Sequence, residues 1–271
     1  MRYLFLRLFS LCITLCTCAY PVSALSEDLA LFEEGHCPHE TTPRSNVWNT
    51  DDTDVSLLNP NYKRVSITFD DAPASTLERL ISVFASYNEE NPDCPAFASL
   101  FCNGIRIQSS TMHSLTSAYA IGWELGNHGY THNDFNKFTF FKAEEEIEKT
   151  DKLLCKIDGK KKHLFRPPFG NLDKAVQAKL EMPIIYWTID TLDWTGTPVK
   201  EIENKVLNNV FDGAIILMHD GYENTVQAVK RLLPALKERG YQCVSISQMA
   251  KAQKQTLFNG KGYIRIRKAK A

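Results

Sequence analysis

The chain lacks an excess of charge of either sign, and it lacks internal repeats and low-complexity tracts. Lys and Arg together number 31 and Asp and Glu 32, so the formal net charge is −1. A near-neutral chain has no electrostatic basis for binding nucleic acid or an anionic membrane surface, and we predict neither as a partner. With 271 residues, of which 44% are apolar, the chain can form one large α/β domain or two small ones.

The N-terminal region lacks an apolar run long enough to cross a bilayer. Residues 8–20 are mostly apolar but too few to span the hydrocarbon core. Arg2 and Arg7 supply a positive start, and residues 22–24 are of the kind that a signal peptidase accepts. We therefore predict that residues 1–24 are a signal peptide, with a membrane anchor as the weaker alternative. Export makes the protein secreted or periplasmic, without stable membrane insertion after cleavage.

The mature chain is also expected to lack an even number of cysteines. Loss of the signal peptide removes three of the eight cysteines and leaves Cys37, Cys94, Cys102, Cys155 and Cys243. In an oxidising compartment an odd number leaves at least one thiol free or buried. Cys94 and Cys102 flank one predicted strand, so they are too far apart to pair with each other.

Composition divides the mature chain into three segments. Residues 25–62 are polar and irregular, and we predict an N-terminal arm laid over the domain. Within it, residues 35–39 (GHCPH) have metal-capable side chains, but the proline and the lack of supporting residues favour a surface turn. Residues 63–250 form the predicted folded domain. Residues 251–271 are rich in Lys and Arg and lack acids, and we predict a disordered or surface extension.

From Arg64 onward, apolar runs alternate with amphipathic helical patterns. Strands are predicted at residues 64–69, 96–102, 122–126, 163–166, 184–189, 214–218 and 242–246. Helices are predicted at residues 75–88, 110–120, 141–157, 171–180, 199–209 and 224–238. In the third helix a solvated face is expected from Glu144, Glu145, Glu146, Glu148 and Lys149. The alternation predicts an α/β fold of parallel βαβ units, closed or nearly closed as a barrel.

Chemically competent residues follow the ends of successive predicted strands. Asp70 and Asp71 come after the first strand, where Pro73 ends it. Later strand ends are followed by His128 and His132, Arg166, Asp190 and Asp193, and His219. In a parallel α/β barrel the carboxyl ends of the strands lie on one face, where active sites form. The sequence therefore predicts a single site built from these residues.

His128 and His132 are four residues apart, a spacing that lets two imidazoles meet one ion. A bare pair at this spacing is more often two hydrogen-bonded surface histidines. A carboxylate from the first strand end reverses that balance, because two His and one Asp leave the fourth position open, as in hydrolytic zinc sites.

Each remaining residue has an ordinary structural alternative. Arg166 can be a structural cation, Asp190 and Asp193 can cap a helix or a turn, and His219 can be a satisfied core histidine. Their joint placement at successive strand ends favours the functional interpretation.

Five motifs occur in order within residues 64–249. They are Thr68-Phe69-Asp70-Asp71-Ala72-Pro73, His128-Gly129-Tyr130-Thr131-His132, Arg166-Pro167-Pro168-Phe169-Gly170, Asp190-Thr191-Leu192-Asp193-Trp194 and Leu217-Met218-His219. In this order they resemble the motifs of polysaccharide deacetylases (NodB-homology domain, carbohydrate esterase family 4). The resemblance implies a distorted (β/α)7 barrel, and metal-dependent hydrolysis of an N-acetyl or O-acetyl group on a polysaccharide.

The resemblance also implies a role for each matching residue. Asp71, His128 and His132 would bind the metal, and Asp70 would be the general base, oriented and kept ionised by Arg166. His219 would protonate the leaving amine, and Asp193 would hold its tautomer. The backbone N–H of Phe169 would bind the oxyanion, while Trp194 and Leu217 would wall a slot for the acetyl methyl. Asp190 is assigned to loop structure or groove lining.

The metal expected is Zn²⁺, although a His₂Asp site also takes Co²⁺ or Ni²⁺. Export favours a polymer of N-acetylglucosamine as substrate, with chitin-type oligomers and O-acetylated xylan as rivals. Two alternatives stay open. A cyclic-amide hydrolase shares the fold, but the signal peptide counts against it. A non-catalytic glycan-binding relative is the other, and the intact metal, base and acid positions count against it.

One departure from the family pattern is Ala72, where the family usually has Gly. If that position needs a positive φ, Ala is strained there and Asp71 is misplaced. We predict that Ala72 is tolerated because the turn there uses negative φ.

Overall fold

The computed structural model describes residues 46–269. The predicted signal peptide (residues 1–24), the tract 35–39 and most of the predicted arm lie outside the described residues. Among the helices that are described, none is both long and apolar enough to cross a membrane.

Strands and helices alternate along most of the described chain. The strands are β1 (Lys63–Ala72), β2 (Ala98–Cys102), β3 (Glu124–Asn127), β4 (Ile184–Ile185), β5 (Ile189–Asp190), β6 (Ala214–His219), β7 (Tyr241–Cys243) and β8 (Gly262–Tyr263). The α-helices are α2 (Leu77–Glu90), α3 (Ser109–Ala120), α4 (Phe140–Asp158), α5 (Lys174–Gln177), α6 (Val199–Asn209), α7 (Glu223–Glu238) and α8 (Ile246–Ala252). Short 3₁₀ turns are η3 (Gly104–Arg106), η4 (Pro168–Gly170) and η5 (Asp193–Thr195).

β1 is the central strand of a parallel sheet with the order β3-β2-β1-β6-β5, and β7 pairs with the first residues of β1. Because side chains alternate along a strand, Val65, Ile67 and Phe69 share one face and join the main core. Thr68 and Asp70 share the opposite face, which is buried but polar. One face of β1 therefore packs in the apolar core, and the other carries the polar side chains.

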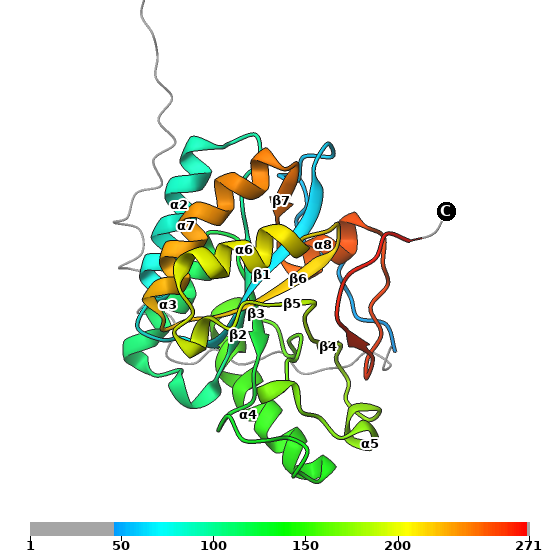
Figure 1. Ribbon diagram of the computed structural model, residues 1–271. Coiled ribbons are helices and arrows are strands. Elements are labelled where there is room, and N and C mark those ends of the chain that lie inside the picture. Colours follow the sequence, from blue (N-terminus) through cyan, green and yellow to red (C-terminus); the bar gives the residue numbers. More distant parts are fainter. Residues whose placement is uncertain (1–45, 270–271) are drawn as a thin grey trace, which may run out of the picture. The chain divides into compact units, whose positions relative to one another are not determined.

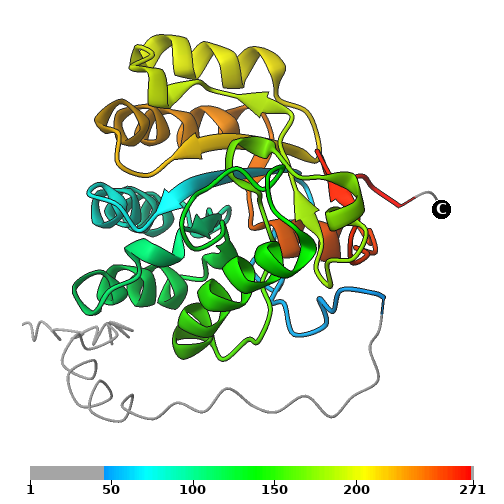
Figure 2. The ribbon, with the colours of Figure 1, turned by 90° about the horizontal axis from the view of Figure 1, so that it is seen from below.

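Helices α6, α7, α2 and α3 follow one another beside the strands, with α4 next to α3 (Figures 1 and 2). Their apolar stripes pack on the sheet and complete the main core. Within it, the rings of Phe69 and Trp123 stack with centroids 5.8 Å apart, and Phe84 meets Trp123 edge-on at 4.6 Å.

Bridges extend the sheet toward a closed barrel. Phe165 is bridged to Asn127 at the end of β3 and to Ile184 of β4, and from β4 the chain runs on to β5, beside β6. The predicted α/β fold, a distorted (β/α)7 barrel of mostly parallel strands, is confirmed in this arrangement.

The structure differs from the predicted elements at several places. The strand expected at 242–246 ends at Cys243 in β7, and Ile246 begins α8, a helix that was not predicted. The strand expected at 163–166 is reduced to the bridge at Phe165, because Pro167 and Pro168 have no N–H to extend a ladder. The strand expected at 184–189 is divided into β4 and β5, since the chain changes partner from Tyr263 to Ile215. The helix expected at 171–180 shortens to α5.

The expectation of a disordered or surface extension is wrong for residues 253–269. β8 pairs with β4, and the N–H of Ile266 donates to the Gly213 carbonyl at 2.9 Å. Leu257, Tyr263 and Ile266 are buried in a second apolar cluster, which also contains Ile185 and Ile215. These three apolar residues anchor the segment, although its composition is basic. Its other lysines and arginines are exposed, whereas Arg265 is half-buried.

Three cysteines, Cys94, Cys102 and Cys243, are free and buried. The predictions that at least one thiol stays unpaired and that Cys94 does not pair with Cys102 are therefore confirmed. Burial raises the pKa of all three thiols, which keeps them protonated and unreactive.

Candidate active site

The strand register brings the predicted residues to one edge of the sheet. Asp70 of β1 stands opposite His219 of β6. Asn127, the last residue of β3 and the one before His128, accepts a hydrogen bond on its carbonyl from the Arg166 N–H at 2.9 Å. Side chains from separate strand ends therefore meet at the carboxyl edge, as the sequence predicted.

Ligand-capable atoms of Asp71, His128 and His132 all lie within 4.8 Å of one another. The Nδ1 of His128 is 2.7 Å from the Arg166 carbonyl, which can only accept, so Nδ1 carries the proton and Nε2 keeps its lone pair. Burial lowers the pKa of His128, which favours the neutral imidazole that a metal needs.

The Oδ1 of Asp71 lies 3.3 Å from Nε2 of His132. It is buried and accepts no hydrogen bond from residues 46–269. A buried carboxylate oxygen without a donor, beside two imidazoles, fits a divalent cation in both charge and ligand type.

Four segments of the site contain a residue with left-handed backbone. These residues are Asp71 (φ 64°), His132 (φ 59°), Phe169 (φ 61°) and Leu192 (φ 55°). Such conformations cost about 1–3 kcal/mol each in residues other than glycine, and they persist where the surroundings fix them. Ala72 is not among the residues of positive φ, so the predicted backbone of that position is confirmed.

Arg166 is fully buried and holds Asp70 in one orientation. Its Nη1 donates to Asp70 Oδ1 at 2.7 Å and to Thr68 Oγ1 at 2.8 Å, and its Nε donates to the Ile185 carbonyl at 3.0 Å. The guanidinium also lies 4.1 Å from the centre of the Phe101 ring. Burial alone would raise the pKa of Asp70. The charge and hydrogen bond of Arg166, together with the charges of His128 and His219, outweigh burial and hold that pKa below its ordinary value.

His219 and Asp193 form a second pair. Nδ1 of His219 lies 2.8 Å from Asp193 Oδ1, and the His219 backbone N–H donates to Oδ2 at 2.8 Å. The Thr225 hydroxyl donates to the same Oδ2 at 2.6 Å. Burial alone would lower the pKa of His219. Its hydrogen bond to Asp193 and the negative charges of Asp70, Asp193 and Asp71 together outweigh burial, so the pKa lies above its ordinary value.

The predicted substrate-binding residues differ in exposure. Phe169 is 63% exposed, and its ring centre lies 4.8 Å from that of His132. Trp194 is 52% exposed, whereas Leu217 is buried in β6. Asp190 accepts from the N–H two residues further on, which is a turn contact of the kind expected for it.

Two buried carboxylates beside the site escaped the sequence interpretation. The predicted solvated face is wrong for Glu146, which is 1% exposed, although its neighbour Glu145 is exposed. Glu146 lies three residues after the buried Ala143 and four before the buried Thr150, a helical spacing that could have revealed it. Asp220 follows His219, is buried, and accepts from the Thr76 hydroxyl at 2.6 Å.

A cavity of about 560 Å³ opens beside Asp71, between the loop that follows β1 and the start of α7. Its lining includes Asp71, Ser75, Arg106, Gln108 and Tyr222. Hydroxyl, amide, guanidinium and phenol groups thus face a space that adjoins the candidate metal ligands.

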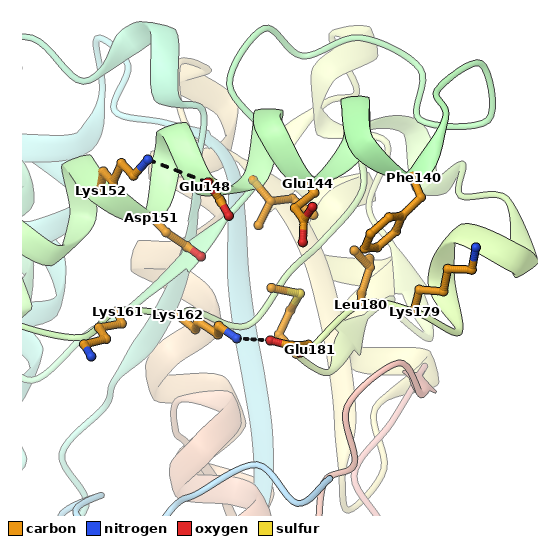
Figure 3. Close-up of a pocket in the computed structure, with 12 residues that line it drawn as sticks. Phe140, Glu144, Glu148, Asp151, Lys152, Lys161, Lys162, Lys179, Leu180 and Glu181 are labelled. Carbon is orange, nitrogen blue, oxygen red and sulfur yellow. Dashed lines mark hydrogen bonds and ion pairs between the residues drawn. The ribbon is translucent and has the colours of Figure 1, made fainter. Parts of the chain in front are cut away.

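A second cavity, of about 420 Å³, lies between α4 and residues 179–182 (Figure 3). Its charged residues include the ion pairs Lys152–Glu148 and Lys162–Glu181. Asp151 extends from α4 toward residues 161–162 in the same view. None of the predicted site residues lines this cavity.

The fold of this chain is shared by a class of carbohydrate-modifying proteins. A sequence model described as polysaccharide deacetylase matches residues 58–185. The peptidoglycan-N-acetylglucosamine deacetylase of Bacillus cereus is 32% identical over 198 residues, which are 70% of this chain and 89% of that protein. The chain belongs to the polysaccharide deacetylase family.

Other relatives are longer. The peptidoglycan-N-acetylmuramic acid deacetylase PdaC of Bacillus subtilis is 30% identical over 199 residues, 73% of this chain and 41% of PdaC. The chain spans less than half the length of this and several other curated relatives. Among solved structures, a family 4 acetyl xylan esterase from Clostridium thermocellum, in complex with a cobalt ion, is similar with a TM-score of 0.69 and 25% identity. The match covers 75% of this chain and 99% of that one.

Proposed function

We propose that this protein is an exported, metal-dependent hydrolase that removes acetyl groups from an N-acetylglucosamine-containing polysaccharide. The observation that carries the proposal is the cluster of Asp71, His128 and His132 beside the Asp70–Arg166 pair. The peptidoglycan deacetylases among its relatives support a cell-wall polymer as the substrate. The predicted signal peptide at residues 1–24 fits that location.

Asp71, His128 and His132 are proposed as the metal ligands, and Zn²⁺ as the metal, with Co²⁺ or Ni²⁺ as substitutes. A bound cation supplies Lewis acidity, which polarises an acyl oxygen and makes a water molecule more acidic.

Asp70 is proposed as the general base for the attacking water. Its Oδ1 is occupied by Arg166, so Oδ2, 3.6 Å from Nε2 of His128, is the oxygen placed to take the proton. The lowered pKa keeps this carboxylate ionised, but it also makes Asp70 a weak base. The attacking water must therefore be acidified before Asp70 can deprotonate it.

His219 is proposed as the general acid. Asp193 occupies Nδ1, which leaves Nε2 to deliver a proton to the leaving amine. The raised pKa increases the fraction of His219 that is protonated near neutral pH.

Phe169 is proposed to stabilise the oxyanion through its backbone N–H. Pro167 and Pro168 have no N–H, so Phe169 provides the first backbone donor after Arg166. One such donor contributes about 3 kcal/mol to transition-state stabilisation. Trp194 and Leu217 are proposed to wall the acetyl methyl, and the polar cavity beside Asp71 to accept the neighbouring sugar.

Acetate release tests the proposal. Wild-type protein and a His132→Ala variant are loaded with zinc, dialysed, and assayed on N-acetylglucosamine oligomers and on O-acetylated xylan. We expect zinc retention and acetate release from the oligomers by the wild type, and loss of both in the variant. Release from xylan alone would favour the O-acetyl esterase alternative, for which the acetyl xylan esterase structure speaks. A wild type that binds zinc but releases no acetate from either polymer would refute the proposed activity.

A further inference from the structure

Glu146 of α4 is a buried carboxylate that binds the segment between the two candidate histidine ligands. Its Oε2 accepts from the Thr131 N–H at 2.7 Å, the Tyr130 N–H at 3.2 Å and the Thr131 hydroxyl at 2.8 Å. Its Oε1 lies 3.6 Å from Nζ of Lys142. Three donors converge on one oxygen, which offsets the cost of burying the charge.

The residue that follows these donors is His132, whose backbone is left-handed (φ 59°). A β-carbon makes this conformation unfavourable, so the residue keeps it only where neighbouring contacts fix the chain. The bonds to Glu146 fix the two residues directly before His132. They therefore set the direction in which its imidazole leaves the backbone.

A second support comes from the same helix. Oδ1 of Asn127 accepts from the Gly129 N–H at 2.8 Å, and its Nδ2 donates to Asp151 Oδ1 at 2.7 Å. Nδ2 also donates to the Ile147 carbonyl of α4 at 2.8 Å. Asp151 thus fixes the start of the loop through Asn127, and Glu146 fixes its end directly.

We propose that Glu146 is a positioning residue, which holds the Tyr130–Thr131 backbone so that His132 presents its imidazole beside His128 and Asp71. This inference rests on the proposed metal site, but it concerns metal affinity and is independent of the substrate. The structure supplies a matched control in Glu145, which forms only exposed ion pairs with Lys142 and Lys149.

The experiment measures zinc affinity by competition with a chromophoric chelator, and thermal unfolding of the metal-free protein, for wild type, Glu146→Ala, Glu146→Gln and Glu145→Ala. Residues that orient metal ligands typically change metal affinity by about 10- to 100-fold when they are replaced. We expect a loss of that size in Glu146→Ala and a change of less than about threefold in Glu145→Ala. Glu146→Gln should stay within about tenfold of wild type, because its amide oxygen can accept the same three bonds.

Zinc affinity in Glu146→Ala within about threefold of wild type would overturn the inference, whatever happens to the melting temperature. So would a Glu146→Gln protein as weak as Glu146→Ala, because the acceptor geometry would then be irrelevant. If Glu146→Ala does not fold, Thr131→Val removes one of the three donors at nearly constant shape and decides the matter. A loss of about threefold or more supports the role, and a smaller change overturns it. A wild type that binds no zinc would instead refute the proposed function itself.

Discussion

Neighbouring aspartates at the end of β1 should respond differently to loss of charge. Asp71 has a buried Oδ1 beside His132, whereas Asp70 is bonded to Arg166. We predict that Asp71→Ala loses the metal, because it removes one of three protein ligands. Asp70→Asn should keep nearly full metal content, because the amide has the same volume and all three ligands remain.

The cost of Asp70→Asn can be derived from its contacts. The amide oxygen can still accept from Arg166 Nη1, but the guanidinium, which is fully buried, loses its counter-charge. Removing one partner of a buried ion pair lowers the free energy of unfolding by about 3–5 kcal/mol. Because Asp70→Asn keeps one hydrogen bond to Arg166, we expect a loss of about 3 kcal/mol. Loss of a positioned general base should lower turnover by about 10²- to 10⁴-fold.

The assay pairs zinc per chain after dialysis with acetate release and thermal unfolding, for Asp70→Asn, Asp71→Ala and Asp71→Asn. An Asp70→Asn protein that loses zinc while Asp71→Asn retains it would show that the two roles are exchanged. Unchanged turnover in a zinc-loaded Asp70→Asn protein would remove Asp70 as the base.

Three further predictions follow from other residues. Ala72→Gly should change zinc affinity less than tenfold, or about 1.4 kcal/mol, because Ala72 does not need positive φ; a hundredfold gain measured by chelator competition would contradict this. His219→Ala should lose turnover while keeping zinc. The raised pKa of His219 predicts that wild-type turnover falls as pH rises through it, and a variant with an unchanged alkaline limb and rate would exclude His219 as the acid. Burial alone would lower the pKa of His163, but its bonds to Asp151 and Asp158 raise it to about 9. The stabilisation from protonated His163 is complete below pH 6.5 and is lost as pH rises through 9. His163→Gln should therefore flatten the decline in the free energy of unfolding over this pH range, measured by urea denaturation. An equally steep decline in the variant would contradict the prediction.

The placement of the site was predictable because it depends on features that a sequence displays directly. Apolar runs mark buried strands, and the carboxyl ends of parallel strands meet at one edge whatever the loops do. Asp70, Arg166 and His219 therefore meet as the strand order requires. The split of the 184–189 strand was not predictable, because it depends on a change of hydrogen-bonding partner.

Strand periodicity alone could not assign the side-chain directions at Asp70 and Asp71. Alternation correctly indicates that neighbouring side chains diverge, but the left-handed backbone at Asp71 changes where its carboxylate points. That φ value is set by the surrounding contacts rather than by the preference of aspartate. The same holds for Phe169 and Leu192, which no propensity would place in that region.

The buried carboxylates of α4 and the strained backbone of the histidine loop have a common explanation. A loop that must hold His132 at positive φ needs fixed acceptors for its N–H groups, and solvent would exchange too freely to fix it. A buried glutamate supplies such an acceptor, and in sequence only its helical spacing from Ala143 and Thr150 distinguishes it from the exposed glutamates around it. A residue that hydropathy readily assigns to solvent is thus the one that the proposed metal site would need in a buried position. Glutamates that fall within a buried helical stripe, as Glu146 does, should therefore be read as candidate supports for a neighbouring site before they are assigned to solvent.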